Sequence, residues 1–415
     1  MQNKKRIAII GSGISGLSSA YFLKNDHEVT LYEKSDRIGG HSRTIDINGL
    51  KVDTGFIVLN DATYPNLNKL FTELKIDIVK TEMSFAISAN DGALEWSGTS
   101  INSLFVQRKN IFNIPMLKGI FDILKFNKSA MNFVAKAPDL TLGELIDQMK
   151  LGSWFREYYI LPMGGAIWSC PYEAMMEFPA STFVNFFENH GLLSISNRPQ
   201  WYTLKNRSIS YVRALEDLIE KSGRIIKNAS IDYIKRTQSG IELKESGQEF
   251  CNYDEVIFAC HPKEVLAMLK DPSSQEQIAL EKFSRQKNIV YTHSDSSQMP
   301  KLKGCWSSWN YLYNKEENSK VSVTYWMNKL QHIDESFPLF VTLNPTRPIA
   351  QDKIYDTCDF YHPVFDQKSI EGQKAIDKLQ GVDKIWFCGA YLRYGFHEDG
   401  IWSATNIVNK INQKF

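Results

Sequence analysis

Six residues near the start of the chain, Gly11-Ser12-Gly13-Ile14-Ser15-Gly16, have the spacing of a turn that binds the pyrophosphate of a dinucleotide. Gly11 permits the tight turn, Gly13 lets backbone N–H groups approach phosphate, and Gly16 allows the next helix to pack closely. Glu33 follows about twenty residues later, where a carboxylate accepts hydrogen bonds from both ribose hydroxyls. Because Glu33 repels a 2′-phosphate, these residues predict NAD or FAD rather than NADP.

The residues around this turn supply the elements that must position it. Arg6 to Ile10, "RIAII", is a β-branched run, and the apolar residues after the glycines repeat at helical spacing. A second strand, "EVTLYEK", leads to Glu33. Strand, glycine turn, helix and strand are the order of a Rossmann-like unit.

A second glycine pair indicates which of the two remaining cofactors, NAD or FAD, is bound. Gly39-Gly40 lies between Arg37 and Arg43, just after the acidic residue. A nicotinamide domain needs no second loop of close approach there, whereas the longer FAD molecule does. We therefore expect FAD.

With these residues the chain resembles the flavoprotein superfamily of amine oxidases, phytoene-desaturase-like enzymes and protoporphyrinogen oxidase, in which an R-x-G-G-R/H loop follows the fingerprint. "VDTGFIVLN", residues 52–60, is similar to the family's Asp-x-Gly turn beside the flavin ring. "KIWFCGAYLRYGFHEDGIWSATN", from Lys384, is similar to its last motif, whose helix N-terminus stabilises negative charge at flavin O2. Residues 229–233 are similar to the strand that contacts adenine.

Two positions depart from the family pattern. Gly389-Ala390 stands where the family usually has Gly-Asp, and Asn206-Arg207-Ser208 stands where it often has a Gly-Gly pair. The resemblance implies that FAD is held by Gly11, Ser12, Gly13, Ile14, Ser15, Gly16, Glu33, Lys34, Arg37, Gly39, Gly40, His41, Ser42, Thr54, Gly55, Phe56, Ile231, Ala259, Gly389, Ala390, Asp399, Gly400, Ile401 and Trp402.

Motifs at the start, middle and end of the 415 residues predict a discontinuous cofactor domain. We expect an α/β fold, with a Rossmann-like FAD-binding domain of the glutathione-reductase-like, amine-oxidase type and an inserted α+β substrate domain. The expected cofactor domain comprises residues 1–95, 196–265 and 376–415, and the substrate domain residues 96–195 and 266–375.

Few catalytic side chains are expected, because a flavin carries the redox chemistry itself. His397 and Glu398 are candidates for an acid or base, with the alternative that Asp399 caps the last helix and His397 packs at the ring edge. Lys287 aligns with a lysine near flavin N5 in some amine oxidases, with a surface lysine as the alternative. Trp168, Trp201 and Tyr325 are candidates for an apolar substrate pocket, with core packing as the alternative.

Composition limits the partners. The formal net charge is +1, so no global field favours nucleic acid, and no His or Cys spacing predicts a metal site. Six scattered cysteines without a CxxC pair are typical of a cytosolic protein. No apolar run reaches the ~18–20 residues of a spanning helix. We expect a cytoplasmic protein, or one that lies peripherally on the inner membrane.

Residues 103–138 are basic and amphipathic, which is typical of a segment that lies on anionic lipid. A solvated face of a core helix and an oligomer contact are the alternatives.

The whole chain most resembles a bacterial subgroup of the superfamily that is associated with cyclopropane-fatty-acyl-synthase-like enzymes. The resemblance implies an FAD-dependent desaturase or dehydrogenase that acts on an unsaturated or methyl-branched fatty-acyl chain of a membrane lipid. Three alternatives remain: an amine oxidase, a redox-neutral flavin isomerase, and a flavin-stabilised binding partner of a lipid methyltransferase.

Overall fold

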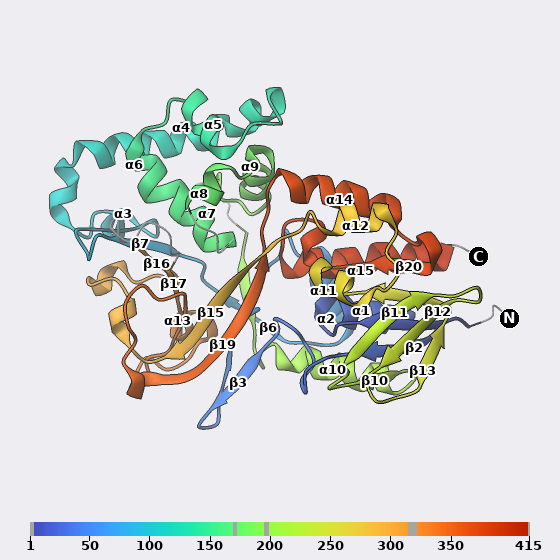
Figure 1. Cartoon of the computed structure of the whole chain (residues 1–415). Helices are drawn as coiled ribbons and strands as arrows, with labels where there is room; N and C mark the ends of the chain where they lie inside the picture. Colours follow the sequence, from blue (N-terminus) through green and yellow to red (C-terminus); the bar gives the residue numbers. More distant parts are fainter. Residues whose placement is uncertain (1–3, 169–171, 195–198, 314–321, 414–415) are drawn as a thin grey trace.

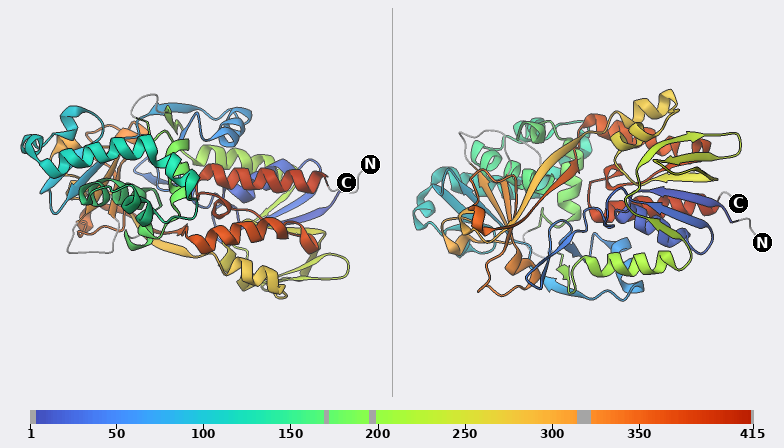
Figure 2. Two further views of the ribbon diagram at one scale, coloured as in Figure 1. Left: turned by 90° about the horizontal axis from the view of Figure 1, so that it is seen from above. Right: turned by 60° about the horizontal axis from the view of Figure 1, so that its bottom comes forward.

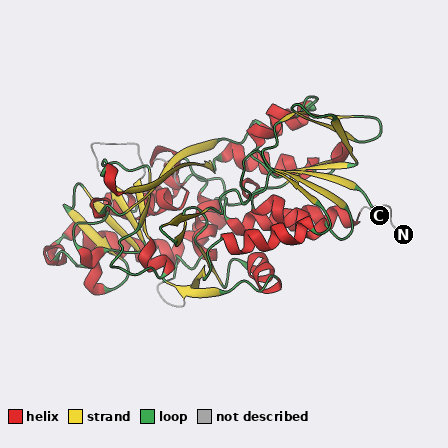
Figure 3. Ribbon diagram, turned by 90° about the horizontal axis from the view of Figure 1, so that it is seen from below, coloured by secondary structure: helices red, strands yellow, loops and turns green. Residues whose placement is uncertain are grey.

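The computed structural model describes residues 4–168, 172–194, 199–313 and 322–413. Each end of the elongated molecule holds a fan of strands, with helices packed around it (Figures 1 and 3). Both termini lie at the same end. Cys170 and the expected domain boundary between residues 195 and 196 lie outside the described residues.

The sheet nearest the termini has five strands, all parallel, in the order β10-β2-β1-β14-β20. This order joins strands from the start, the middle and the end of the chain, as the distribution of motifs predicts. The strands are β1 (Arg6–Ile10), β2 (Glu28–Tyr32), β10 (Arg224–Ile226), β14 (Glu255–Phe258) and β20 (Ile385–Phe387).

Both faces of this sheet are buried, as is usual for a parallel sheet. In β1, Ile7 and Ile9 face α1, α10 and α15, while Ala8 and Ile10 face the β11-β12-β13 sheet and α11, α12 and α14. Figure 2 shows α15 running along the sheet towards the termini. These elements are α1 (Ile14–Leu23), α10 (Ile209–Glu220), α15 (His397–Gln413), β11 (Ile231–Arg236), β12 (Ile241–Glu245), β13 (Phe250–Tyr253), α11 (Pro262–Met268), α12 (Ser274–Leu280) and α14 (Gln367–Leu379).

The second domain is built on a seven-stranded mixed sheet in the order β19-β15-β18-β17-β16-β7-β8. Its strands are β7 (Phe85–Ala89), β8 (Leu94–Ser97), β15 (Arg285–His293), β16 (Trp309–Tyr313), β17 (Ser322–Trp326), β18 (Phe340–Leu343) and β19 (Ile354–Pro363). An aromatic core packs helices against it. These are α4 (Ile114–Lys136), α5 (Leu142–Gln148), α6 (Ser153–Phe155), α7 (Leu161–Trp168), α8 (Tyr172–Met176) and α9 (Ala180–Asn189).

Short elements connect the two domains. A hairpin and a three-stranded sheet, β5-β9-β6, lie between them. They comprise β3 (Thr44–Ile47), β4 (Leu50–Asp53), β5 (Val58–Asn60), β6 (Ile78–Thr81) and β9 (Trp201–Leu204), with the helices α2 (Pro65–Glu73) and α13 (Met327–Gln331) nearby. The short helix α3 (Ile101–Leu104) contacts β8 in the second domain. Among the described residues, no helix is both long enough and apolar enough to cross a bilayer.

Strand pairing and core packing divide the chain differently from the expected boundaries in three places. β7 and β8, placed in the cofactor domain as part of 1–95, belong to the second sheet because β7 pairs with β16. Residues 266–280 and 367–375 were placed in the substrate domain. They form the end of α11, all of α12 and most of α14, and these helices pack against the parallel sheet. A local pattern predicts a strand or helix but not its partner.

Candidate cofactor site and active site

The glycine turn has the predicted geometry. Gly11 has φ +103°, and a Cβ on Gly16 would lie 1.8 Å from the Gly11 carbonyl oxygen, so the start of α1 packs directly on the turn. A Cβ on Gly13, in contrast, would meet no protein atom within 4 Å. Gly13 precedes α1 without a side-chain cap, so the first-turn N–H groups are available to an anion in the open space beside Gly13.

Glu33 ends β2 beside this turn, and its buried carboxylate orders the loop. One oxygen accepts from the Ser12 N–H at 3.0 Å and from the Ser12 hydroxyl at 2.5 Å. The other accepts from the Ser35 N–H at 2.9 Å and from its hydroxyl at 2.8 Å. The Ala229 N–H donates to the Glu33 carbonyl at 2.9 Å, so the predicted adenine strand lies beside the predicted ribose site.

The Gly39-Gly40 loop lies against the same turn. Gly40 has φ +56°, and a Cβ there would lie 2.9 Å from the Gly13 Cα. The Arg37 guanidinium donates to the Gly40 carbonyl at 3.0 Å. The two glycine motifs therefore form one cradle, as expected of a loop that approaches an extended cofactor.

The Asp-Thr-Gly turn runs beside this loop. The Phe56 N–H donates to the His41 carbonyl at 3.0 Å, and a Cβ on Gly55 would lie 2.0 Å from that oxygen. The fully buried Asp53 carboxylate accepts from Thr44, Ser208 and the Gln331 amide. Burial raises the pKa of Asp53, and the hydrogen bonds from Thr44 and Ser208 oppose this.

The loop Asn206-Arg207-Ser208, which replaces the family's Gly-Gly pair, therefore binds the Asp53 carboxylate. Arg207 has φ +66° and donates to the backbone carbonyls of Lys51 and Gln331. Sequence analysis missed this network, because Asp53 lies 155 positions from Ser208 and 278 positions from Gln331 along the chain.

The last motif places α15 against α1. A Cβ on Gly400 would lie 2.6 Å from a methyl carbon of Ile14, so these helices cross closely. The Gly389 N–H donates to the Ser403 hydroxyl at 2.9 Å, which ties the turn after β20 to α15. Ala390, at the position of the usual aspartate, offers only its backbone groups to a ligand.

The N-terminus of α15 meets the Ser42 loop and the Asp-Thr-Gly turn. The His397 ring stacks on Phe56 with centroids 4.0 Å apart. His397 Nε2 lies 2.7 Å from the Tyr211 hydroxyl and 3.1 Å from the Ser42 hydroxyl, and these two hydroxyls are also hydrogen-bonded to each other. Sequence analysis missed Tyr211, whose position in α10 reads as an ordinary core residue.

The predicted acid or base candidates have restricted roles in this arrangement. Burial, with His41 nearby, lowers the pKa of His397 to about 3, so the ring is neutral and a weak base at pH 7. Both oxygens of Glu398 accept hydrogen bonds from the start of α2, at Asn66 and Leu67. Asp399 accepts from the Phe396 N–H at 2.9 Å, which completes a cap of α15. These contacts favour the structural alternatives.

Lys287 lies on the outer side of β15. It is half exposed and forms an ion pair with Asp359 at 2.8 Å. Side chains alternate along a strand, so the next residue, the fully buried Asn288, faces inwards. Its amide lies 2.8 Å from His362 Nδ1, and the His362 ring lies 5.5 Å from the His41 ring. The inner residue of this strand is therefore Asn288, and these contacts favour the surface-lysine alternative for Lys287.

His41, in the glycine loop, joins the two domains. Its ring lies 4.8 Å from the Phe360 ring of β19. Arg43 binds the Asp356 carboxylate of β19 through two contacts of 2.7 and 2.9 Å. β19 and β15 are thereby held against the cofactor loop.

The three predicted pocket residues do not form one group. Trp168 is buried against Phe178 and Phe186, Trp201 starts β9, and Tyr325 packs edge-to-face on Trp309. Trp168 therefore agrees best with the core-packing alternative.

An aromatic cluster lies where the domains meet, and sequence analysis named only its member Trp201. The Phe186 ring stacks on His190 at 3.7 Å and on Phe396 at 4.7 Å, and Trp201 and Tyr64 lie within 6.5 Å of His190. We call Tyr64, Phe186, His190, Trp201 and Phe396 the junction cluster. Its member Phe396 directly precedes His397.

The remaining predicted cofactor residues lie on or beside these elements. Lys34 is exposed and pairs with Glu264, and Trp402 is half-buried under the Arg393 guanidinium. The others are Ser15, Thr54, Ile231, Ala259 and Ile401, all buried or half-buried.

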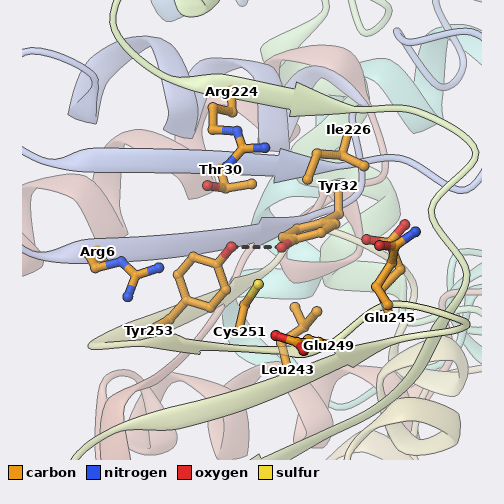
Figure 4. A pocket seen from close by; sticks show the side chains of 11 residues that line it. Arg6, Thr30, Tyr32, Arg224, Ile226, Leu243, Glu245, Glu249, Cys251 and Tyr253 are labelled. Carbon is orange, nitrogen blue, oxygen red and sulfur yellow. Dashed lines mark hydrogen bonds between the residues drawn. The ribbon is translucent and has the colours of Figure 1, made fainter.

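A cavity of about 430 Å³ lies elsewhere, between β2, β10 and the β12-β13 hairpin. Figure 4 shows Tyr32 and Tyr253 hydrogen-bonded across it, with Arg6 and Arg224 at its side. None of the predicted site residues lines it.

The residues present fit FAD. Open space at Gly13, uncapped N–H groups and a carboxylate beside the adenine strand match its ADP half. The Ser42 loop, the Asp-Thr-Gly turn and the α15 N-terminus converge where the ring would follow.

Comparison with known proteins agrees with this site. The model of the NAD(P)-binding Rossmann-like domain family matches residues 9–74. The chain is 28% identical to coproporphyrinogen III oxidase of Staphylococcus aureus, over 61% of this chain and 60% of that protein. It is 25% identical to a Mycobacterium tuberculosis protein named as a flavin-containing monoamine oxidase, over 64% of this chain and 59% of that protein.

The chain thus matches about 60% of the length of each of these relatives. Among solved structures, a fatty acid isomerase from P. acnes that produces CLA superposes over 99% of both chains, with a TM-score of 0.69 and 13% identity. This likeness shows the fold. Together with the glycine cradle and the α15 motif, these similarities support the predicted resemblance to the FAD-dependent amine oxidase superfamily.

Proposed function

We propose that this chain is an FAD-dependent oxidoreductase that acts on an apolar substrate at the meeting point of its two domains. The observation that carries this proposal is the position of the junction cluster directly before His397, at the N-terminus of α15. Burial lowers the pKa of His190 to about 4, so the imidazole in this cluster is neutral at pH 7. An aromatic, uncharged wall suits a hydrocarbon chain.

The roles of the chain's residues follow from the geometry. The first turn of α1 and the Gly40 loop would hold the pyrophosphate, Glu33 would hold the ribose, and the N-terminus of α15 would stabilise charge on the ring. FAD, when bound, supplies a hydride acceptor. The Ser42–Tyr211–His397 hydrogen bonds and the Arg43–Asp356 ion pair keep the surrounding elements in register.

We further propose that the substrate is an unsaturated or methyl-branched acyl chain of a membrane lipid. One C–H bond would give up a hydride and its neighbour a proton to solvent, and the two electrons would pass to O₂ or a quinone. Support comes from the apolar junction cluster and from the fold shared with an enzyme that acts on fatty acids.

Two other activities remain as candidates. Aromatic rings also bind cations, and one relative is named as a monoamine oxidase, so amine oxidation stays a rival. The outward position of Lys287 counts against it. The fold shared with a fatty acid isomerase supports a redox-neutral isomerase as well as it supports the lipid dehydrogenase. Such an isomerase would move a double bond without consuming an electron acceptor.

Anaerobic titration of the flavoprotein tests these proposals. We expect phospholipids with unsaturated or methyl-branched chains to bleach the oxidised flavin band near ~450 nm, and amines to leave it intact. Bleaching by amines alone would overturn the lipid proposal. Double-bond migration without bleaching or O₂ uptake would establish the isomerase. In the matched pair, Asn288→Ala should slow bleaching by at least about tenfold, as for loss of a positioning group, and Lys287→Ala should not.

A further inference from the structure

A group of exposed apolar side chains lies on the second domain, in and before α4. Seven of the fourteen exposed large hydrophobic residues among the described positions fall within residues 101–131. They are Ile101, Ile111, Phe112, Ile114, Phe121, Leu124 and Met131, of which Phe112 is 85% and Phe121 70% exposed. This many exposed large apolar side chains within one short segment is typical of an interaction site.

The orientation of α4 fixes this surface. Met116, Phe126 and Val134 are buried on one side of the helix, while Phe121 and Met131 lie on the other. A Cβ on Gly119 would lie 2.0 Å from the Trp154 ring, so α4 is locked against α6. The helix cannot rotate to bury Phe121. Figure 1 shows α4 along the outer edge of the molecule, at the end opposite to the termini.

Cations surround the exposed apolar residues. Arg108 and Lys109 lie on the 3-10 turn η1 (Arg108–Phe112), and Lys118, Lys128 and Lys136 lie on the solvent side of α4. Lys125 of α4 is also exposed, but its ammonium donates to the Met149 carbonyl at 2.5 Å. Within the described part of the chain, none of these six forms an ion pair with an acidic side chain. The single acid of the segment, Asp122, accepts from the Gly152 N–H at 2.9 Å and is thereby directed at the protein.

We propose that the face formed by α3, η1 and α4 docks on an anionic lipid membrane. Phe112, Phe121 and their apolar neighbours would enter the headgroup–acyl boundary, and the lysines would contact lipid phosphates. A second copy of the chain fits this face less well, because a two-fold contact would bring six cations against six. An acidic membrane supplies both the apolar layer and the negative charge.

This surface lies one helix layer from the proposed substrate site. Phe126 of α4 packs on Phe187 of α9 at 6.4 Å, and Phe186 of α9 belongs to the junction cluster. Docking does not depend on the proposed substrate, and its test uses binding alone.

Co-sedimentation of the flavoprotein with vesicles tests the proposal. We expect binding to vesicles of equal parts phosphatidylcholine and phosphatidylglycerol, and little binding to phosphatidylcholine alone. The double variant Phe112→Ser/Phe121→Ser should lose at least about tenfold in affinity, on the scale for burying such side chains. Its matched control, Phe250→Ser/Ile278→Ser, changes two exposed apolar residues of the cofactor domain and should bind normally.

A charge-reversal pair isolates the electrostatic part. Lys118→Glu/Lys128→Glu/Lys136→Glu should lower binding by at least about a hundredfold, because each lysine contributes about fivefold near an anionic surface. The control Lys368→Glu/Lys374→Glu/Lys378→Glu, on α14, carries the same charge and should bind within about twofold of the parent.

Equal loss in both members of either pair would overturn the proposal, as would absence of binding by the unmodified flavoprotein. Light scattering provides a further check, with flavin content as the measure of folding. If the chain is a dimer that Phe112→Ser/Phe121→Ser dissociates, and neither form binds vesicles, the face is a self-interface and the proposal is wrong.

Discussion

The variant Gly13→Ala tests whether the space beside Gly13 is needed by the cofactor rather than by the folded protein. Gly13 has φ −64° and ψ 179°, a conformation that alanine adopts freely, and a Cβ would meet no protein atom within 4 Å. The folded apoprotein should therefore accept the methyl group. The same methyl group would occupy the space in which the pyrophosphate approaches α1.

The two expected magnitudes differ. Replacing glycine where alanine fits stabilises by about 0.4–1 kcal/mol, and alanine is a poorer helix cap than glycine by a similar amount, so apoprotein stability should change by less than about 1 kcal/mol. Displacing the pyrophosphate from even one charge-assisted hydrogen bond costs about 1.5–3 kcal/mol. FAD affinity should therefore fall by about 10- to 150-fold.

Urea unfolding of the apoprotein measures the first quantity, and fluorescence titration with FAD measures the second. Gly49→Ala is the matched control, because Gly49 also has open space at its Cβ but has φ +88°. It should lose about 1–2 kcal/mol of stability and keep its FAD affinity. FAD affinity of Gly13→Ala within twofold of the parent would show that the phosphates lie elsewhere, and a strongly destabilised apoprotein would show that the space is not open.

Further variants test neighbouring parts of the site. Glu33→Ala should weaken FAD by about 1.5–3 kcal/mol in the same titration, and unchanged affinity would place the ribose contact elsewhere. Glu398→Ala should leave the Asn66 and Leu67 N–H groups without their acceptor and cost about 1–3 kcal/mol of stability, measured by urea unfolding. Its flavin content should match that of the parent, whereas loss of flavin with unchanged stability would return Glu398 to a direct role at the cofactor.

Elements formed by residues close together in the sequence could be predicted. The face on which a strand residue lies, and contacts between residues far apart in the chain, could not. The glycine turn, α1, β2 and Glu33 lie within thirty residues or so of one another, and each needs only its neighbours to form. On β15, composition indicated a strand but not which side faces inwards, so the sequence left Lys287 between a place near the flavin and the surface, and it did not single out Asn288. A one-residue difference in phase moves a side chain to the opposite face.

Networks between distant residues gave no sequence signal. Asp53, Ser208 and Gln331 are ordinary polar residues until the fold brings them together. Of the junction cluster only Trp201 was a sequence candidate, because the members lie on α9, on β9 and at three positions in loops. The motif comparison placed Asp399 near the cofactor, while the structure shows its carboxylate completing the cap of α15. Motif resemblance thus located the region, but the role of each side chain required its contacts.

Asp399 also predicts a pH dependence. Burial raises the pKa of this carboxyl to about 7, against hydrogen bonding from the Phe396 N–H and the charge of Arg393, while the neighbouring Glu398 charge raises it further. A carboxyl with a higher pKa in the folded than in the unfolded chain takes up a proton on folding. Its contribution is therefore most favourable below about pH 4 and is lost as the pH rises to about 7, by at most about 4 kcal/mol.

Buried histidines act in the opposite direction, since the lowered pKa values of His190, His362 and His397 make stability rise between about pH 4 and 6.5. The difference between Asp399→Asn and the parent isolates the carboxyl, because the asparagine oxygen still accepts from the Phe396 N–H. We expect the thermal midpoint of the variant to gain on the parent from pH 5 to 7 and to keep a constant lead above pH 7.5 or so. A lead that is the same at every pH would show that Asp399 stays ionised in the folded protein, and would remove this carboxyl from the groups that respond to pH beside the N-terminus of α15.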